Sequence, residues 1–175
     1  DPYLSRGLGD VYKRQAGGPA PGHDFSMTSY ISPFQMAAEA GLGRTVHAGE
    51  GRPPDEIRTA IERLGAQRIG HGTTLLDDAD VVALLLERGV TVEACVTSNF
   101  HTGVIPAVQA HPLPRWLDLG LSVCVCTDNT LLSDVSAPEE HARVRAIPGM
   151  TPEKLEAAVA FGHAAAFTAQ SAQPS

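Results

Sequence analysis

Four short apolar segments of this chain each end in polar side chains, and this pattern constrains the fold more than any other feature. The segments are residues 44–49, 68–72, 90–98 and 121–129, and they are rich in valine, isoleucine and cysteine. Short runs of this kind predict strands that are buried on both faces, as in a parallel sheet. The polar residues at their ends are His47, Glu50, His71, Thr97, Ser98, Asn99, Asp128 and Asn129.

Amphipathic helices are predicted between these strands. In residues 54–65, apolar side chains recur at i, i+3, i+4 and i+7, and Gly65 suits the helix end. Strands that alternate with helices predict βα units and a parallel sheet. The predicted helices are residues 54–65, 77–89, 113–120, 137–147 and 151–167, with Asp77 or Asp78 as N-cap of the second and Thr151 as N-cap of the last.

Open doubly wound sheets and closed barrels both fit this alternation. In a βα barrel, the catalytic groups lie at the carboxyl ends of several different strands. An open sheet would instead gather its ligand at one switch point. Because all four predicted strands end in polar groups, the barrel is favoured. The chain has neither a GxGxxG nor a GxxxxGK[ST] motif, so neither of these nucleotide sites is expected.

Composition excludes several classes of function. With 13 basic and 20 acidic residues the net charge is -7, which disfavours a nucleic-acid-binding surface. No run of about 18 apolar residues predicts a membrane-spanning helix, and no signal peptide is expected. Three cysteines are too few for a disulfide framework, so a reducing, cytoplasmic location is predicted.

The chain divides into unequal parts. Residues 1–28 show neither helical nor strand periodicity and contain many glycines and prolines, so they are predicted to be an unstructured and non-native head. Residues 29–170 form the predicted α/β domain, and residues 171–175 form a tail.

The strand-end residues suggest metal-assisted hydrolysis. His47, His71 and Asp128 are good ligands for zinc or a similar ion. A catalytic metal activates a water, and Glu50 could face a substrate as an acid or base. Each residue also has a structural alternative, since a histidine can cap a carbonyl, a lone glutamate can lie in solvent, and Asp128-Asn129 can form a turn or an N-cap. Turns and caps do not explain polar groups at every strand end.

Other metal-binding residue types are assigned to packing or surface. Cys124 and Cys126 would share one face of the last strand, where the small apolar thiol is more often core filling than a metal site. Structural zinc sites use four ligands and a different spacing. The remaining histidines are predicted to be surface or packing residues: His23, His101, His111, His141 and His163.

Four motifs, in this order and at these spacings, resemble the adenosine deaminase family. They are TVHAGE (45–50), RIGHGT (68–73), EACVTSN (93–99) with TGV and HPL after it, and TDN (127–129). The resemblance covers roughly residues 30–168 and is similar to the bacterial members, which carry Asn at the position of Asn129. It implies an α/β fold, namely a partial (β/α)8 TIM barrel that comprises the C-terminal four or so βα units.

The resemblance also implies the roles of the site residues. His47 and Asp128 would bind one Zn²⁺, and Glu50 would donate a proton to N1 of the purine. His71 would orient and help deprotonate the attacking water, with Asp128 assisting, and Asn129 would contact the purine near N7. The implied reaction is hydrolytic deamination of adenosine and deoxyadenosine to the inosine products and ammonia. The implied partner is a small purine nucleoside, with no nucleic acid and no membrane.

The chain departs from the family pattern in two ways. The His-x-His pair that would supply two further zinc ligands is absent, and four predicted strands are half of the eight of a barrel. This chain alone is therefore expected to be unstable and inactive. Alternatives are a deaminase that acts on adenine, AMP or another purine, and a non-catalytic purine-binding remnant.

Overall fold

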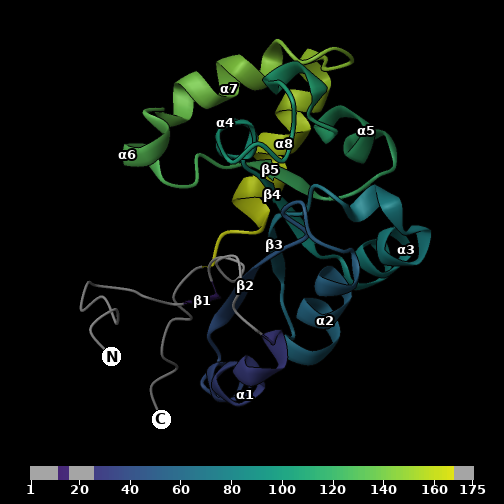
Figure 1. The fold of residues 1–175 in the computed structure, drawn as a ribbon, viewed down its shortest axis with the longest axis vertical. Coiled ribbons are helices and arrows are strands. Elements are labelled where there is room, and N and C mark those ends of the chain that lie inside the picture. The colour runs from purple at the N-terminus through teal and green to yellow at the C-terminus, as the bar shows by residue number, and fades with distance from the viewer. Residues whose placement is uncertain (1–11, 16–25, 168–175) are drawn as a thin grey trace.

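The computed structural model describes residues 12–15 and 26–167, which contain an all-parallel sheet whose strands lie in chain order (Figure 1). Each strand pairs with the next one along the chain, so the carboxyl ends of all strands meet at one edge of the sheet. The predicted α/β architecture of successive βα units is confirmed. The strands are β1 (Tyr12–Gln15), β2 (Gly43–Ala48), β3 (Arg68–His71), β4 (Thr91–Ala94) and β5 (Val123–Val125).

Helices follow the strands and pack against them. Figure 1 shows α1, α2 and α3 along one side of the sheet, and α8 crosses β5. None of the described helices is long and apolar enough to cross a membrane. The helices are α1 (Ile31–Glu39), α2 (Asp55–Leu64), α3 (Ala79–Arg88), α4 (Val96–His101), α5 (Leu113–Asp118), α6 (Thr130–Ser133), α7 (Ala137–Arg145) and α8 (Pro152–Ala164), with 3-10 turns η1 (Met27–Tyr30), η2 (Leu75–Asp77) and η3 (Val108–Ala110).

One core joins the sheet to these helices. Apolar side chains of the central strands are fully buried and meet the inward faces of α2, α3 and α5. Burial of each such side chain contributes roughly 1.5–3 kcal/mol relative to exposure. Central members of this core are Val46, Ile57, Ile69, Leu85, Val92, Trp116 and Val123.

The helix ends follow the sequence signals. Gly65 and Gly89 end α2 and α3 in the left-handed conformation, with φ of 62° and 61°. The carboxylate of Asp78 accepts hydrogen bonds from two backbone N–H groups at the start of α3. Thr151 likewise accepts from the backbone N–H of Lys154 at the start of α8. These local signals therefore set the helices that flank the sheet.

The third and fourth strands are shorter than predicted. β4 ends at Ala94, and the predicted strand residues 96–98 lie in helix α4. The cause is tertiary: the buried carboxylate of Glu140 accepts hydrogen bonds from the backbone N–H (2.8 Å) and the hydroxyl of Thr97. This interaction satisfies a free N–H group at the start of α4. β5 likewise ends at Val125, so Cys126 lies beyond the strand.

Part of the predicted unstructured head is a strand. β1 pairs in parallel with β2 over four residues, so the prediction for residues 1–28 is wrong at Tyr12–Gln15. The turn η1 also starts at Met27, inside the predicted head. Residues 1–11, 16–25 and 168–175 lie outside the described part of the chain, and so do the predicted tail and the predicted domain end at residue 170.

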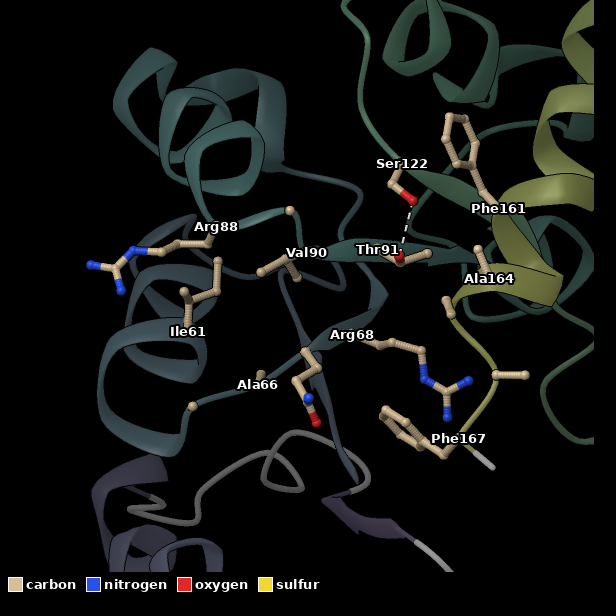
Figure 2. A pocket seen from close by; sticks show the side chains of 15 residues that line it. Ile61, Ala66, Arg68, Arg88, Val90, Thr91, Ser122, Phe161, Ala164 and Phe167 are labelled. Atoms are coloured by element: carbon tan, nitrogen blue, oxygen red, sulfur yellow. Dashed lines mark hydrogen bonds between the residues drawn. The ribbon is translucent and has the colours of Figure 1, made fainter. Parts of the chain in front are cut away.

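A cavity of about 630 Å³ opens at the amino ends of the strands. Gln67, Arg68, Thr91 and Ser122 line it, and Figure 2 shows the Arg68 guanidinium lying against the Phe167 ring. The guanidinium carbon is 3.7 Å from the centre of that ring. Because the strands are parallel, this cavity lies at the opposite end of the sheet from the polar strand ends.

Candidate metal centre and active site

His47 lies on β2 and its ring rests against the backbone of β3. Its register partner on β3 is Gly70, and a Cβ built at Gly70 would lie 2.6 Å from Cδ2 of His47. Real Cβ atoms essentially never approach so closely. Gly70, the first glycine of the RIGHG segment, therefore provides the space that the His47 ring occupies.

His71 and Asp128 both have strained backbones. Their φ angles are 70° and 55°, in the left-handed region that residues with a side chain rarely adopt. Such a conformation costs of order 1–3 kcal/mol and persists where the surrounding structure holds it. Asp134 is the one other non-glycine residue with positive φ in the described part of the chain. Two of these three strained residues therefore lie at the same strand ends.

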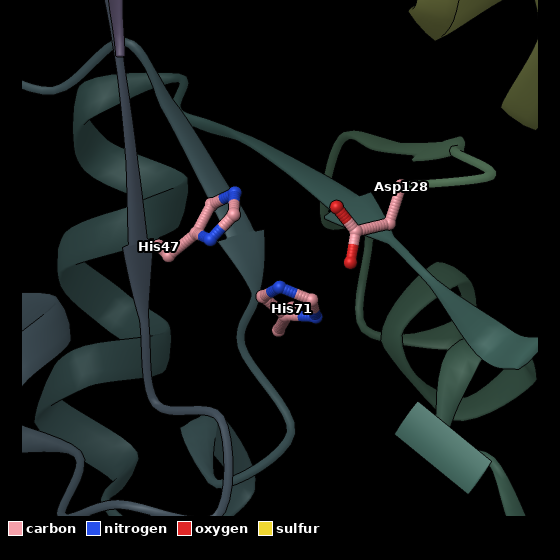
Figure 3. Close-up of side chains that lie close together, drawn as sticks. All are labelled: His47, His71 and Asp128. Carbon is pink, nitrogen blue, oxygen red and sulfur yellow. The ribbon is translucent and has the colours of Figure 1, made fainter. Parts of the chain in front are cut away.

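His47, His71 and Asp128 converge at the carboxyl edge of the sheet (Figure 3). One ligand atom from each lies within 4.8 Å of the other two, and the two imidazole rings pack edge to face with centroids 4.7 Å apart. Two imidazoles and one carboxylate are a donor set that suits zinc. Among the residues that the structure describes, no other His, Cys, Asp or Glu group converges in this way.

Hydrogen bonds fix the segment that carries Asp128. The hydroxyl of Ser98 donates to Oδ2 of Asp128 over 2.8 Å. The next residue, Asn129, uses Oδ1 to accept from the backbone N–H groups of Leu131 (3.1 Å) and Leu132 (3.0 Å), which caps α6. The N-cap alternative for Asn129 is therefore confirmed, and its contact with a purine stays a proposal.

Glu50 lies in the loop after β2, beside His71. Gly49 has φ of 66°, and its carbonyl accepts a hydrogen bond from the hydroxyl of Thr73 over 2.8 Å, which holds the loop. The hydroxyl of Thr102 donates to Oε1 of Glu50 over 3.1 Å. The other carboxylate oxygen lies 3.5 Å from Nε2 of His71. The carboxyl group therefore sits at the rim of the histidine cluster.

His111 was predicted to be a surface or packing residue, and its 3% exposure agrees with packing. Sequence reasoning missed its contact with the site: its Nε2 lies 3.3 Å from Oδ1 of Asn99. Nδ2 of Asn99 lies 2.9 Å from Nδ1 of His71. Burial and, to a smaller extent, the nearby His71 together lower the pKa of His111 to about 3. The HPL segment was the sequence signal that could have pointed to it.

The other histidines play no part in this cluster. His101 and His163 are exposed, and His141 is partly buried and contacts the carbonyl of Ala137. His23 lies outside the described residues.

The cysteines do not form the metal site. Burial raises the pKa of Cys124 to about 12, so its thiol stays protonated at neutral pH. A hydrogen bond with Cys126 and burial also raise the pKa of Cys95. A thiol that keeps its proton is a poor metal ligand, which agrees with the prediction for Cys124. Neither Cys124 nor Cys126 belongs to the converging group of potential ligands.

Comparison with known proteins identifies related chains. The family model described as "Adenosine deaminase" matches residues 16–173, a range that begins within the predicted head. The adenosine deaminase of Vibrio parahaemolyticus is 35% identical over 138 residues, which is 79% of this chain and 41% of that protein. The adenosine deaminase of Clostridium kluyveri is 41% identical over 117 residues, 67% of this chain and 34% of that protein.

Solved structures share the fold. A zinc-bound amidohydrolase from Burkholderia ambifaria matches with a TM-score of 0.75 and 26% identity, over 86% of this chain and 42% of that one. An adenine deaminase from Arthrobacter aurescens matches with a TM-score of 0.56 and 29% identity, over 78% of this chain and 47% of that one. An Arabidopsis ADAL structure in complex with IMP matches with a TM-score of 0.78 and 23% identity, over 91% and 45%.

These matches give the extent of the chain within its relatives. It spans about two fifths of the length of the curated relatives. The described sheet and helices are a partial (β/α)8 barrel, and they cover 42% and 45% of the length of the Burkholderia and Arabidopsis barrel chains. Since the family model matches residues 16–173, the chain belongs to the adenosine deaminase family.

Proposed function

We propose that the full-length protein that contains this chain is a Zn²⁺-dependent hydrolase that converts adenosine and deoxyadenosine to their inosine products and ammonia. The observation that carries this proposal is the convergence of His47, His71 and Asp128 beside Glu50 in a member of this family. A purine 6-amino group needs an activated water and a proton donor, and this cluster offers residues for both.

The residues present fit a zinc ion. His47 and Asp128 would hold it, and the space left at Gly70 lets the imidazole of His47 lie beside the other donors. Two further histidine ligands are expected from the family's His-x-His pair, which the 175 residues do not contain. When bound, Zn²⁺ lowers the pKa of a water at the site to ~7, so this water can lose a proton at neutral pH and act as the nucleophile.

The chain's own residues bind the base and move its protons. Glu50 is held by Thr102 at one oxygen and would donate a proton to N1 of the purine, which makes C6 more electrophilic. The water oxygen forms a bond to C6 and the C6–N bond breaks; one proton of the water goes to the amino group, which leaves as ammonia, and the other returns to the Glu50 carboxylate. His71 points Nε2 toward this region and would orient the water. Asn129 would contact the base near N7 with the part of its amide that does not cap α6.

The substrate is the finer part of the proposal. Structural relatives include an adenine deaminase and a protein solved with IMP, so adenine and AMP are the alternative substrates. The test is to incubate the full-length protein with adenosine, deoxyadenosine, adenine and AMP and to separate the products by chromatography. We expect inosine and deoxyinosine. Hypoxanthine from adenine or IMP from AMP as the favoured product would instead support an alternative.

A non-catalytic purine-binding remnant is the remaining alternative. Adenosine affinity without turnover, in full-length protein loaded with Zn²⁺, would support it. We also propose that the 175-residue chain alone does not deaminate adenosine, because the expected His-x-His ligands are not among its residues. Inosine production by this chain would contradict that.

A further inference from the structure

A chain of hydrogen bonds connects the backbone of α5 to the ring of His71. The backbone N–H of Leu113 donates to Nδ1 of His111 over 3.1 Å. The other nitrogen of His111 contacts Oδ1 of Asn99, and Nδ2 of Asn99 contacts Nδ1 of His71. All the side chains involved are buried, with exposures of 3% for His111, 0% for Asn99 and 1% for His71. Bulk water therefore does not compete for these contacts.

The direction of this chain follows from its first member. A backbone N–H can only donate, so Nδ1 of His111 is an acceptor and carries no proton. A neutral imidazole has one proton, which must then be on Nε2 of His111. The partner of Nε2 is therefore an acceptor, the amide oxygen of Asn99.

The same reasoning continues through the amide. With the oxygen of Asn99 turned toward His111, its NH₂ group is turned toward His71 and can only donate. Nδ1 of His71 is therefore an acceptor without a proton. The proton of the neutral His71 ring must then be on Nε2, the nitrogen that lies 3.5 Å from the carboxylate of Glu50.

We infer that Asn99 and His111 are positioning residues that fix His71 in the tautomer with its proton on Nε2. His71 then offers the site a hydrogen-bond donor. Its Nε2 has no lone pair for a metal, which leaves His47 and Asp128 as the ligands from this chain. In the proposed deamination, on which this consequence rests, His71 orients the water by donating to its oxygen; it acts neither as a metal ligand nor, as the resemblance implied, as a base that helps to deprotonate the water.

A substitution at Asn99 can reverse the direction of the hydrogen bond between residue 99 and Nδ1 of His71. Asn99→Asp has nearly the same shape, but both of its oxygens accept. It can accept from Nε2–H of His111, and its other oxygen then favours a proton on Nδ1 of His71. The proton of His71 is therefore expected to move from Nε2 to Nδ1. His141→Gln, on α7 away from the cluster, is the matched control that should leave His71 unchanged.

The test is ¹⁵N NMR of histidine-labelled, metal-free full-length protein, with the His71 signals assigned by their loss in His71→Gln. In the wild type we expect a protonated Nε2 and an unprotonated Nδ1. In Asn99→Asp we expect the two shifts to exchange, and in His141→Gln we expect no exchange. A second variant, His111→Leu, removes the Nε2–H group that donates to Asn99, so the single wild-type state of His71 should be replaced by a mixture of tautomers.

The outcomes separate this inference from the proposed function. A proton on Nδ1 of His71 in the wild type overturns the inference without any variant, even where Asn99→Asp fails to fold. Unchanged His71 shifts in both Asn99→Asp and His111→Leu also overturn it. The expected tautomers in a protein that deaminates no purine would refute the proposed function and leave the inference standing, because the NMR measurement needs neither metal nor turnover.

Discussion

The two ends of the same parallel strands differ in what their polar side chains do. At the amino end of β3, the Arg68 guanidinium stacks on Phe167 and reaches to within 3.2 Å of the carboxylate of Glu93 on β4, so its charge is paired within the fold. At the carboxyl end, His47 and Asp128 turn toward a shared point. The Arg68 ion pair is engaged within the fold, while the donor atoms at the carboxyl end converge on one another as a set that suits a metal ion.

This difference shows why cavity size does not locate the site. The cavity of about 630 Å³ lies at the amino end, where the Arg68 guanidinium already stacks on the Phe167 ring. The carboxyl end has the strained backbones of His71 and Asp128 and the converging donor atoms. Functional residues of βα barrels lie at that end because its loops can vary without disturbing the barrel. Variants at the two ends should therefore change different measured quantities.

The largest expected effect is at Glu50. In the full-length protein, Glu50→Gln removes the proposed proton donor and should lower kcat by about 10²–10⁴-fold. Zn²⁺ content should stay at the wild-type level, since Glu50 is not a proposed ligand. The matched control is Glu62→Gln on the exposed side of α2, which should change neither quantity. Loss of the metal in Glu50→Gln would show that this carboxylate has another role.

Two glycines allow the ends to be compared directly. Gly70→Ala places a Cβ 2.6 Å from the His47 ring, and Gly43→Ala places one 2.3 Å from the Phe167 ring. Both should destabilise the fold, but only Gly70→Ala displaces a proposed ligand. We expect it to weaken Zn²⁺ binding by about 10–100-fold, measured by competition with a chelator. Equal metal affinities in the two variants would refute the distinction between the ends.

Glu93, on β4, tests the structural assignment of its ion pair with Arg68. Its carboxylate accepts from Thr45 over 3.0 Å and pairs with Arg68, and its side chain is 10% exposed. Glu93→Gln leaves the guanidinium without its counter-charge and should lower the free energy of unfolding by about 3 kcal/mol, measured with urea. Zn²⁺ affinity should not change; a loss of metal with unaltered stability would contradict the assignment.

The smallest expected effect is a pH dependence of stability at His111. Its pKa is about 3 in the folded protein, because the ring is buried and lies near His71, and about 6.5 in the unfolded chain. Between these values the unfolded chain binds more protons, so stability falls as the pH is lowered through this window. The loss from about pH 7.5 to about pH 5 is about 2 kcal/mol. His111→Gln should flatten this part of the stability profile; an unchanged slope would mean that other groups cause it.

Local signals predicted most of the helices but not the ends of the strands. The caps of α3 and α8 are contacts within one turn, so Asp78 and Thr151 could be recognised from the sequence alone. The start of α4 depends on Glu140, whose contact with Thr97 spans 43 positions of the chain. Valine and threonine favour a strand there, and no local pattern reveals the distant carboxylate that favours the helix.

The residues of the candidate site also differ in whether a pattern in the sequence or only a long-range contact reveals them. His47, His71 and Asp128 could be brought together from the sequence because the carboxyl ends of parallel strands meet at one edge. His111 follows no strand and is flanked by residues typical of a loop, so only its contact with Asn99 reveals its place. Strand β1 was missed because its four residues, one tyrosine followed by three polar side chains, show no apolar alternation that would indicate a strand.

The most direct test of the central claim is a crystal structure of the full-length protein grown with Zn²⁺, with anomalous diffraction recorded at the zinc absorption edge. We predict one strong anomalous peak at the carboxyl edge of the sheet, bound by His47 and Asp128. A peak at Cys124 and Cys126, a peak in the cavity at the amino end beside Arg68, or no peak in zinc-saturated crystals would contradict the account.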